Sequence, residues 1–271
     1  VGLILEEGLP IGTLSRVATS LGSAARAAGV RVVAGDTKVV PRGAADGLYI
    51  NTTGVGMVPE GRALGFDRIL PGDVILVSGP IGNHGVAIPS TRAGLSFETP
   101  VLSDAQPLHH LVEAVLTAGG EGEQEREEGR GGVCFLRDAT RGGLATTLKE
   151  VAIETGLDLT IDESRIPIDD AVRGATELLG LDPLYLANEG KMLVICRPDV
   201  TETVLAAMHA RPEGAGAAEI GRVGETAGAV QATGASQAAT AASQAAAAGQ
   251  AVSAREGRLI MQTMYGGRRL L

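Results

Sequence analysis

Large aromatic side chains are nearly absent from this sequence. Tryptophan does not occur, and aromatic residues make up only 2% of the 271 residues. Aliphatic side chains must therefore fill the core, and the hydrophobic fraction of 44% is large enough to do so. Such a core suits layered α/β folds, in which buried strands are rich in β-branched residues and helices in alanine and leucine.

Cysteine is scarce as well. The two cysteines, Cys134 and Cys196, lie far apart and match neither a zinc-binding spacing nor a disulfide framework. Each lies in an apolar run, which predicts a buried, reduced thiol. No basic and apolar signal peptide opens the sequence, so we expect a cytoplasmic protein.

Basic charge and long apolar runs are also lacking. The sequence has 23 basic and 32 acidic residues, a formal net charge of −9. With so few aromatic residues, this charge argues against a nucleic-acid partner. No apolar run approaches the roughly 18 residues that a membrane helix needs, so no membrane span is predicted.

Hydrophobic periodicity predicts strands that alternate with helices. Helices are predicted at residues 10–29, 104–118, 140–155, 167–179 and 199–210. Strands are predicted at residues 1–5, 30–34, 48–58, 73–77, 133–136, 157–161, 191–196, 218–223 and 259–263. This order predicts an α+β fold of mixed α/β layers.

Proline and glycine near residues 59–71 mark a domain boundary, which predicts one domain at 1–62 and a second α/β domain at 63–271. The second domain carries two low-complexity insertions. Residues 119–132 are acidic and bounded by glycine, and residues 224–257 lack an apolar stripe and are expected to separate two paired strands. Because the sequence opens directly in a predicted strand, we expect that part of the first domain lies outside it.

The segment Asp36-Thr37-Lys38 places an acid, a hydroxyl and a base directly after the strand predicted at 30–34. Asp36 can hold a divalent cation through oxygen, and Lys38 can meet a phosphate as a point charge. A surface turn with an incidental ion pair is the simpler alternative. This segment alone does not decide between the two.

A second polar segment opens the helix predicted at 140–155. It consists of Asp138, Ala139, Thr140, Arg141, Gly142 and Gly143. Glycines at a helix N-terminus expose N–H groups to an anion, which the helix dipole also favours, and Arg141 adds a bidentate donor. Alternatively, Asp138 or Thr140 simply caps the helix.

Two more polar segments adjoin predicted strands. Residues 79–85 form a glycine-rich loop that contains His84 but lacks the pattern of a P-loop or a dinucleotide fingerprint. Glu189 precedes a strand and could act as a base or a metal-facing carboxylate, with Asn188 orienting it. The simpler interpretations are a surface or capping role for His84 and a solvated turn at Glu189.

Five segments in this order resemble the family of the hydrogenase maturation protein HypE, which belongs with the aminoimidazole ribonucleotide synthetase-like ATP enzymes. The segments are residues 36–40, 79–85, 138–144, 182–190 and 265–269. Each is moderately specific, but five in the right order are a strong indication. The resemblance covers nearly the whole sequence apart from the two insertions.

The resemblance implies the two-domain fold of that superfamily, with residues 1–62 as part of an ATP-binding and dimerisation domain. It also implies a dehydratase that uses ATP and Mg²⁺ to turn a thiocarboxamide on its own C-terminal cysteine into a thiocyanate. Phosphorylation makes the amide oxygen a leaving group, so that a C≡N bond can form. The cyanide would then pass to the iron of a [NiFe]-hydrogenase.

By position, the resemblance implies that Asp36 holds Mg²⁺ and that Lys38 contacts the phosphates or the thiocarboxamide. Glu189 would accept amide protons, with His84 as a weaker participant. The residues implied to bind the nucleotide and its phosphates are Thr37, Asn51, Thr52, Asp138, Thr140, Arg141, Gly142 and Gly143.

The implied partners are a second copy of the protein, the carbamoyltransferase HypF and the iron-carrying HypC–HypD complex. The family ends in a cysteine, whereas this sequence stops at Leu271, and two cysteines in core strands cannot replace it. We therefore expect the chain to be incomplete for turnover as it stands. The alternatives are a related kinase or synthetase similar to thiamine-monophosphate kinase, and a partner-binding scaffold without nucleotide.

Overall fold

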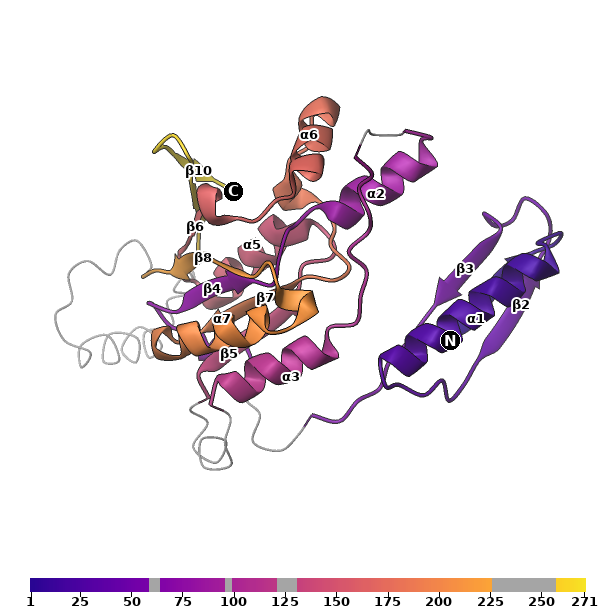
Figure 1. The fold of residues 1–271 in the computed structure, drawn as a ribbon, viewed down its shortest axis with the longest axis horizontal. Coiled ribbons are helices and arrows are strands. Elements are labelled where there is room, and N and C mark those ends of the chain that lie inside the picture. The colour runs from indigo at the N-terminus through magenta and orange to yellow at the C-terminus, as the bar shows by residue number, and fades with distance from the viewer. Residues whose placement is uncertain (59–63, 96–98, 121–130, 226–256) are drawn as a thin grey trace, which may run out of the picture. The chain divides into compact units, whose positions relative to one another are not determined.

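The computed structural model describes residues 1–58, 64–95, 99–120, 131–225 and 257–271. The chain divides into two compact units, residues 1–60 and 61–271 (Figure 1). Their roles as an ATP-binding part and a C-terminal domain stay predictions.

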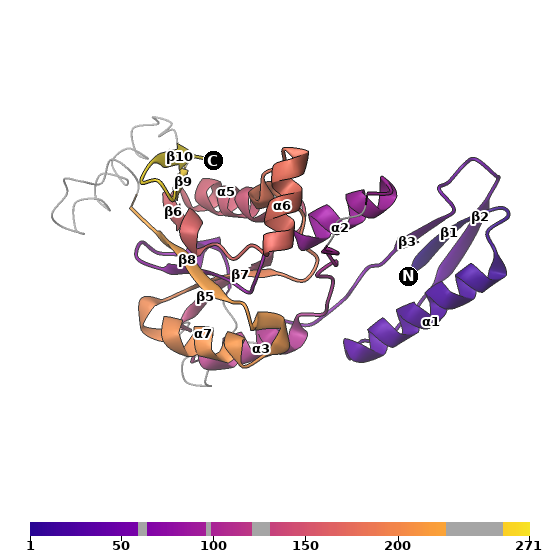
Figure 2. The same cartoon turned by 45° about the horizontal axis from the view of Figure 1, so that its top comes forward.

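In the first unit, a helix lies along one face of a three-stranded sheet (Figures 1 and 2). The strands are β1 (Gly2–Glu6), β2 (Asp36–Val40) and β3 (Leu48–Asn51), and the helix is α1 (Ile11–Ala27). The central strand β1 pairs in parallel with β2 and antiparallel with β3. Two parallel strands need a crossover connection, which α1 supplies.

The strand predicted at residues 30–34 is wrong, because the strand of this region is β2, which begins at Asp36. In the pairing with β1, Asp36 lies opposite Gly2, the first residue of β1. The apolar side chains of this stretch remain exposed: Val30, Val32 and Val33. The polar segment that begins at Asp36 thus lies inside a strand rather than at the end of one.

The second unit is built on a seven-stranded sheet in the order β10-β9-β6-β8-β4-β7-β5. Its strands are β4 (Val74–Val77), β5 (Val133–Asp138), β6 (Leu159–Asp162), β7 (Met192–Cys196), β8 (Ala218–Val223), β9 (Leu259–Gln262) and β10 (Arg268–Leu270). All neighbours pair antiparallel except β6 and β9, which are parallel.

Helices cover both faces of this sheet (Figure 2). They are α2 (Asn83–Arg92), α3 (His109–Ala118), α5 (Gly143–Thr155), α6 (Asp170–Leu179) and α7 (Thr201–His209). Helices α3 and α7 pack on one face and α5 on the other, while α2 packs against α6 through Val86 and Val172.

Strand β4 shows how the sheet is buried from both sides. Val74 and Leu76 join the core beneath α3 and α7, whereas Ile75 and Val77 join the core beneath α5. All four side chains are 0% exposed. A continuous apolar run is typical of a strand with both faces covered, and the predicted fold of mixed α/β layers is confirmed.

Most predicted elements of the second unit occur, with shifted ends. Helices α3, α5, α6 and α7 lie within the predicted ranges but begin later. Helix α2 and strand β10 were not predicted. Because α2 begins at Asn83, His84 lies on a helix rather than in a loop. In the first unit, the strand predicted at 48–58 ends at Asn51.

The prediction that strands 218–223 and 259–263 pair with each other is wrong, because β6 lies between β8 and β9. Leu159 of β6 faces Val223 on one side and Leu259 on the other. Asp158 bonds to both flanking segments: its carbonyl oxygen accepts from Gly224 N–H at 2.7 Å, and its Oδ1 accepts from Arg258 N–H at 2.9 Å. Residues 226–256 and 121–130, which make up most of the two insertions, lie outside the described residues.

Both cysteines are buried as predicted, Cys134 in β5 and Cys196 in β7, and neither forms a disulfide. Burial, with a contribution from Asp73, raises the pKa of the Cys134 thiol to about 12. Burial raises the pKa of Cys196 to about 11, although a hydrogen bond with Thr201 acts in the opposite direction. Within the described ranges, no helix has the length and apolar character needed to cross a bilayer.

Candidate functional site

In the first unit, Asp36 and Asn51 lie in one row of the sheet. Both face Gly2 of the central strand, Asp36 through the parallel pair and Asn51 through the antiparallel pair. Residues directly opposite one another in a sheet point their side chains to the same face. Since Gly2 has no side chain, nothing from β1 fills the space between the carboxylate and the amide.

Lys38 lies in the next row on the same face, with Ile4 of β1 beside it and Tyr49 beyond. Ile4 is 42% exposed, whereas Leu5, on the opposite face, is 9% exposed. The face with Ile4 is therefore the open one. It carries three of the predicted site residues, together with Tyr49, which the sequence analysis did not single out.

The other two predicted residues of the first unit lie differently. Thr37 alternates with Asp36 along the strand, so its side chain points to the opposite face, and its N–H donates to Asp36 Oδ1 at 2.8 Å. Thr52 follows the end of β3 and is exposed. The structure therefore does not bring these hydroxyls into the group formed by Asp36, Lys38 and Asn51.

In the second unit, the predicted polar segments meet at one edge of the sheet. Strands β4 and β5 end there, and β7 begins there. Ser78 N–H donates to Met192 O at 3.0 Å, and Ala139 N–H donates to Lys191 O at 3.4 Å. The glycine-rich loop, the segment around Arg141 and the segment around Glu189 are thus neighbours.

Asn188 connects these three segments. Its side chain is 0% exposed. Its Oδ1 accepts from Gly82 N–H at 2.8 Å, and its Nδ2 donates to Ala139 O at 2.9 Å and Leu186 O at 3.1 Å. Both N–H groups of the amide are thus donated to backbone carbonyl oxygens, so none is left for the Glu189 carboxylate. Asn188 therefore does not orient the Glu189 side chain by direct contact, and any effect on Glu189 passes through the backbone.

Two glycines at the start of α5 are required by the backbone. Gly142 and Gly143 have φ of 70° and 63°, in the left-handed region that favours glycine. A Cβ on Gly143 would lie 2.5 Å from the carbonyl oxygens of Leu184 and Leu186. The glycines thus allow the segment before Asn188 to pack closely on the helix start.

The alternative that Asp138 or Thr140 caps α5 is wrong. The capping residue is Gly142, and no side chain of the described chain bonds to the helix start as a cap. Asp138 and Arg141 are exposed, and among the described residues none forms a hydrogen bond or ion pair with the Arg141 guanidinium. Arg141 is thus available to an anion at this edge.

Glu189 is exposed, and a neighbouring segment holds its backbone. Its N–H donates to Asp104 Oδ1 at 3.2 Å, and Gln106 Nε2 donates to Gly190 O at 3.2 Å. A Cβ on Gly190 would clash with the carbonyl oxygen of Asp104. We call residues 103–106 the strap, because they pass directly over Glu189 and Gly190.

His84 contacts the same strap from the first turn of α2. Its Nδ1 lies 2.9 Å from Ser103 Oγ, which also accepts from Ala105 N–H at 3.2 Å. The sequence placed His84 near the glycine-rich loop, and the structure adds this link to the segment over Glu189.

Sequence reasoning missed two residues of this edge. Asp104 contacts a residue 85 positions away, and no spacing in the sequence indicates that contact. Lys191 directly follows Gly190, and its Nζ lies 3.3 Å from where a Cβ on Gly79 would be, beside the glycine-rich loop. Its position next to Glu189 was a usable signal.

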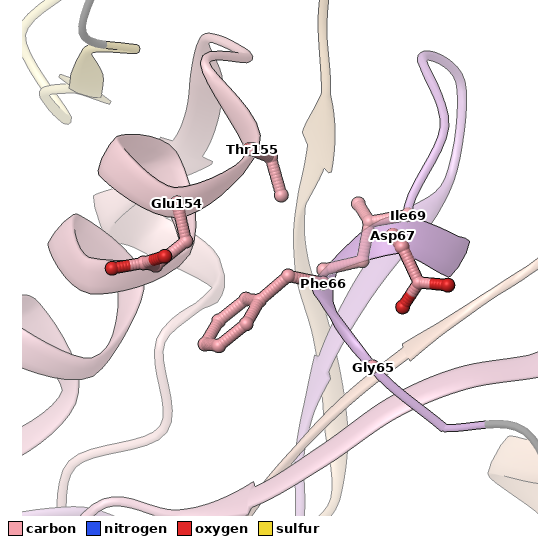
Figure 3. A pocket seen from close by; sticks show the side chains of 6 residues that line it. All are labelled: Gly65, Phe66, Asp67, Ile69, Glu154 and Thr155. Atoms are coloured by element: carbon pink, nitrogen blue, oxygen red, sulfur yellow. The ribbon is translucent and has the colours of Figure 1, made fainter.

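No group of three or more His, Cys, Asp or Glu side chains that could hold a metal occurs in the part of the chain that the structure describes. A pocket of about 560 Å³ lies at the other end of α5, away from Gly143 (Figure 3). It is lined by Gly65, Phe66, Asp67, Ile69, Glu154 and Thr155. The carboxylates of Asp67 and Glu154 point away from each other (Figure 3), and the pocket contains no predicted site residue.

Comparison with known proteins gives a consistent result. Residues 71–232 match the family described as AIR synthase related protein, C-terminal domain. The chain is 51% identical over 222 residues to carbamoyl dehydratase HypE of Azotobacter vinelandii, which covers 82% of this chain. The chain spans only 62% of that relative's length.

Solved structures agree with the sequence match. The fold is similar to that of hydrogenase maturation protein HypE in complex with ATP, with a TM-score of 0.82 and 43% identity, covering 100% of this chain and 71% of that one. It is also similar to a chain of a HypE–HypF complex, with a TM-score of 0.81 and 36% identity, covering 100% of this chain and 75% of that one.

Proposed function

The chain belongs to the HypE family of AIR synthase-related proteins, and we propose that it serves in ATP-dependent dehydration of a carbamoyl group on a cysteine. The product would be a thiocyanate, the source of cyanide for the iron of a [NiFe]-hydrogenase. The observation that carries this proposal is the meeting of three polar segments at one sheet edge through Asn188. A relative solved with ATP supports the choice of nucleotide.

The proposed reaction balances as follows. The amide oxygen of the thiocarboxamide attacks the γ-phosphorus of ATP, and ADP leaves. The oxygen then departs with the phosphoryl group as inorganic phosphate while the C≡N bond forms, and the nitrogen gives up both of its protons. The protein's part is to neutralise phosphate charge and to accept protons.

Residues of the second unit suit these two tasks. Arg141, unpaired among the described residues, would bind phosphate beside the left-handed Gly142 and Gly143. Asp138 and Thr140 adjoin this loop. Glu189, exposed at the same edge, would accept an amide proton, and His84 would assist from α2.

Residues of the first unit suit a nucleotide and its metal. Asp36 and Asn51 offer oxygen ligands in one row of the open face, and Lys38 offers a positive charge in the next row. Mg²⁺ is usually held by one or two carboxylates together with phosphates and water, so Asp36 fits such a site. The bound ion would offset phosphate charge. Thr37 and Thr52 would contact the nucleotide only through their backbone groups or at the periphery of the site.

The substrate thiol must come from another cysteine. Cys134 and Cys196 are 1% and 0% exposed, so neither can receive a carbamoyl group. HypF is the partner that we propose for delivering this group, since a related HypE has been solved in complex with HypF. Dimerisation through the first unit and contact with a HypC–HypD complex are further proposals that rest on the family.

The test is ATP hydrolysis and thiocyanate formation by the full-length protein. Asp36→Asn and Lys38→Ala should each reduce turnover to near background, whereas Arg16→Gln on the outside of α1 should not. Turnover of both variants at the unaltered rate would overturn the roles of these residues. Calorimetry that finds no micromolar ATP binding would favour the scaffold, and a C-terminus that accepts no carbamoyl group would favour a small-molecule kinase.

A further inference from the structure

The backbone around Glu189 is held from two sides. On the inner side, Asn188 is fully buried and bonds to two segments that are distant in sequence. On the outer side, the strap bonds to the N–H of Glu189 and the carbonyl oxygen of Gly190. An exposed side chain on a doubly fixed backbone is a favourable arrangement for accurate placement.

The inner contacts depend on a primary amide. Asn188 Oδ1 accepts from Gly82 N–H, and Nδ2 donates to the carbonyl oxygens of Ala139 and Leu186. A carboxylate in its place would put an oxygen against two carbonyl oxygens. Alanine would leave Gly82 N–H and Leu186 O without these partners, and Ala139 O with only the Asn188 N–H. Neither substitute reproduces the geometry.

One distant partner belongs to the segment proposed to bind phosphate, and the other belongs to the glycine-rich loop that leads to His84. Gly82 directly precedes α2, and Ala139 lies two residues before Arg141. The Asn188 N–H also donates to Ala139 O, at 3.2 Å, so that backbone and side chain fix the same point. The position of Glu189 relative to Arg141 is therefore set through Asn188.

We propose that Asn188 is a positioning residue, which holds Glu189 in place as proton acceptor beside the phosphate-binding loop. This inference rests on the proposed function. A misplacement of about 1 Å lowers the rate of such a reaction by roughly a hundredfold. Loss of the amide should therefore act on the chemical step, while ATP binding, which does not depend on Glu189, should change little.

The experiment uses the full-length protein and the variants Asn188→Ala, Glu189→Gln and the double variant. In Asn188→Ala we expect kcat to fall about 10–100-fold and KM for ATP to stay within about twofold. In the Glu189→Gln background the same substitution should lower the residual rate by less than about twofold, because residues that act as a unit are not additive. The control is Thr176→Val, which removes a hydroxyl that is 1% exposed from α6, where no site residue lies.

Equal losses of kcat in Asn188→Ala with and without Glu189 would overturn the proposal, because a merely structural role is additive. Amide hydrogen exchange gives a readout independent of turnover. The N–H groups of Gly82 and Glu189 should exchange faster in Asn188→Ala and not in Thr176→Val, and unchanged exchange would overturn the positioning. If the unaltered protein binds ATP but forms no thiocyanate, the proposed function fails. Faster exchange in Asn188→Ala would then still show that Asn188 fixes the backbone at Glu189.

Discussion

Arg197 donates hydrogen bonds to both carboxylate oxygens of Asp73, at 2.7 and 2.6 Å, across the ends of β7 and β4. Asp73 is 1% exposed, and its Oδ2 also accepts from Leu70 N–H at 2.8 Å. Arg197 Nη2 donates to Arg68 O at 2.8 Å. Burial alone would lower the pKa of Arg197, but the hydrogen bond with Asp73, together with nearby groups that include Cys134 and Asp199, raises it, so the guanidinium stays charged.

Asp73→Ala should therefore lower the free energy of unfolding by about 2–4 kcal/mol, because it leaves the Arg197 charge partly buried without its partner. The measurement is urea unfolding followed by circular dichroism. Arg269→Ala, which removes an exposed ion pair with Asp182, is the control and should cost less than about 1 kcal/mol. Similar losses in both variants would contradict this assignment.

Stability should fall at alkaline pH because of the two buried thiols. Their pKa values are raised in the folded chain, to about 12 for Cys134 and about 11 for Cys196, from a reference of 9.0. The neutral thiols therefore contribute their full stability below pH 9 and lose it as the pH rises through the folded values, because the unfolded chain ionises first. Unfolding measured between pH 8.5 and 10 should show this decline.

The double variant Cys134→Ala, Cys196→Ala is the comparison for the alkaline decline. It should be less stable at pH 8 because two buried side chains are shortened. Its stability should nonetheless depend less steeply on pH over the same window. An unchanged slope would show that other groups cause the decline.

Acid should loosen the loop between β2 and β3. Glu6 accepts hydrogen bonds from the N–H groups of Gly43 and Gly47, and these bonds lower the pKa of its carboxyl from 4.5. The contribution is present above pH 4.5 and is lost as the pH falls through the lowered value. The protection of the Gly43 and Gly47 amides, taken relative to their intrinsic exchange rates at each pH, should therefore fall below pH 4.

Glu6→Gln should show low protection at these two amides already at pH 7, with little further loss of protection in acid. Glu7→Gln, at the neighbouring exposed position, should behave like the unaltered protein. A loss of protection in acid that is equally large in Glu6→Gln would mean that another group holds the loop.

Gly143→Ala should destabilise the second unit by at least about 2 kcal/mol. Its φ of 63° disfavours any Cβ by about 1–2 kcal/mol, and the added atom would also approach two carbonyl oxygens. Gly174→Ala in α6 is the matched control, because a Cβ there meets nothing within 4 Å. That change should stabilise the helix by about 0.5–1 kcal/mol, as measured by thermal unfolding.

Local patterns predicted the elements that local forces determine. The apolar spacing from Leu144 to Ala152 placed α5 correctly, because one helix face must be buried whatever surrounds it. The apolar run at 30–34 had the same local pattern, but in the structure the strand that pairs with β1 begins at Asp36. Strand prediction failed where the answer depended on another segment.

In the candidate site, too, the sequence indicated the residues but not the long-range contacts between them. Residue types identified Asp36, Lys38, Arg141 and Glu189 as functional candidates. The contacts that arrange the second unit's edge join Asn188 to groups 106 and 49 positions away, and such separations leave no periodic trace in the sequence. Only the folded sheet reveals that Asn188 joins three loops and makes no direct side-chain contact with its neighbour Glu189.

The row through Val223, Leu159 and Leu259 also determines how short the connection between β8 and β9 can be. Two strand spacings separate Val223 from Leu259, about 10 Å. A connection of about four to six residues can span that distance, since an extended residue covers about 3.3–3.6 Å. The sheet therefore does not require a connection as long as residues 226–256. A deletion within them would test what the segment contributes without changing the register of any strand.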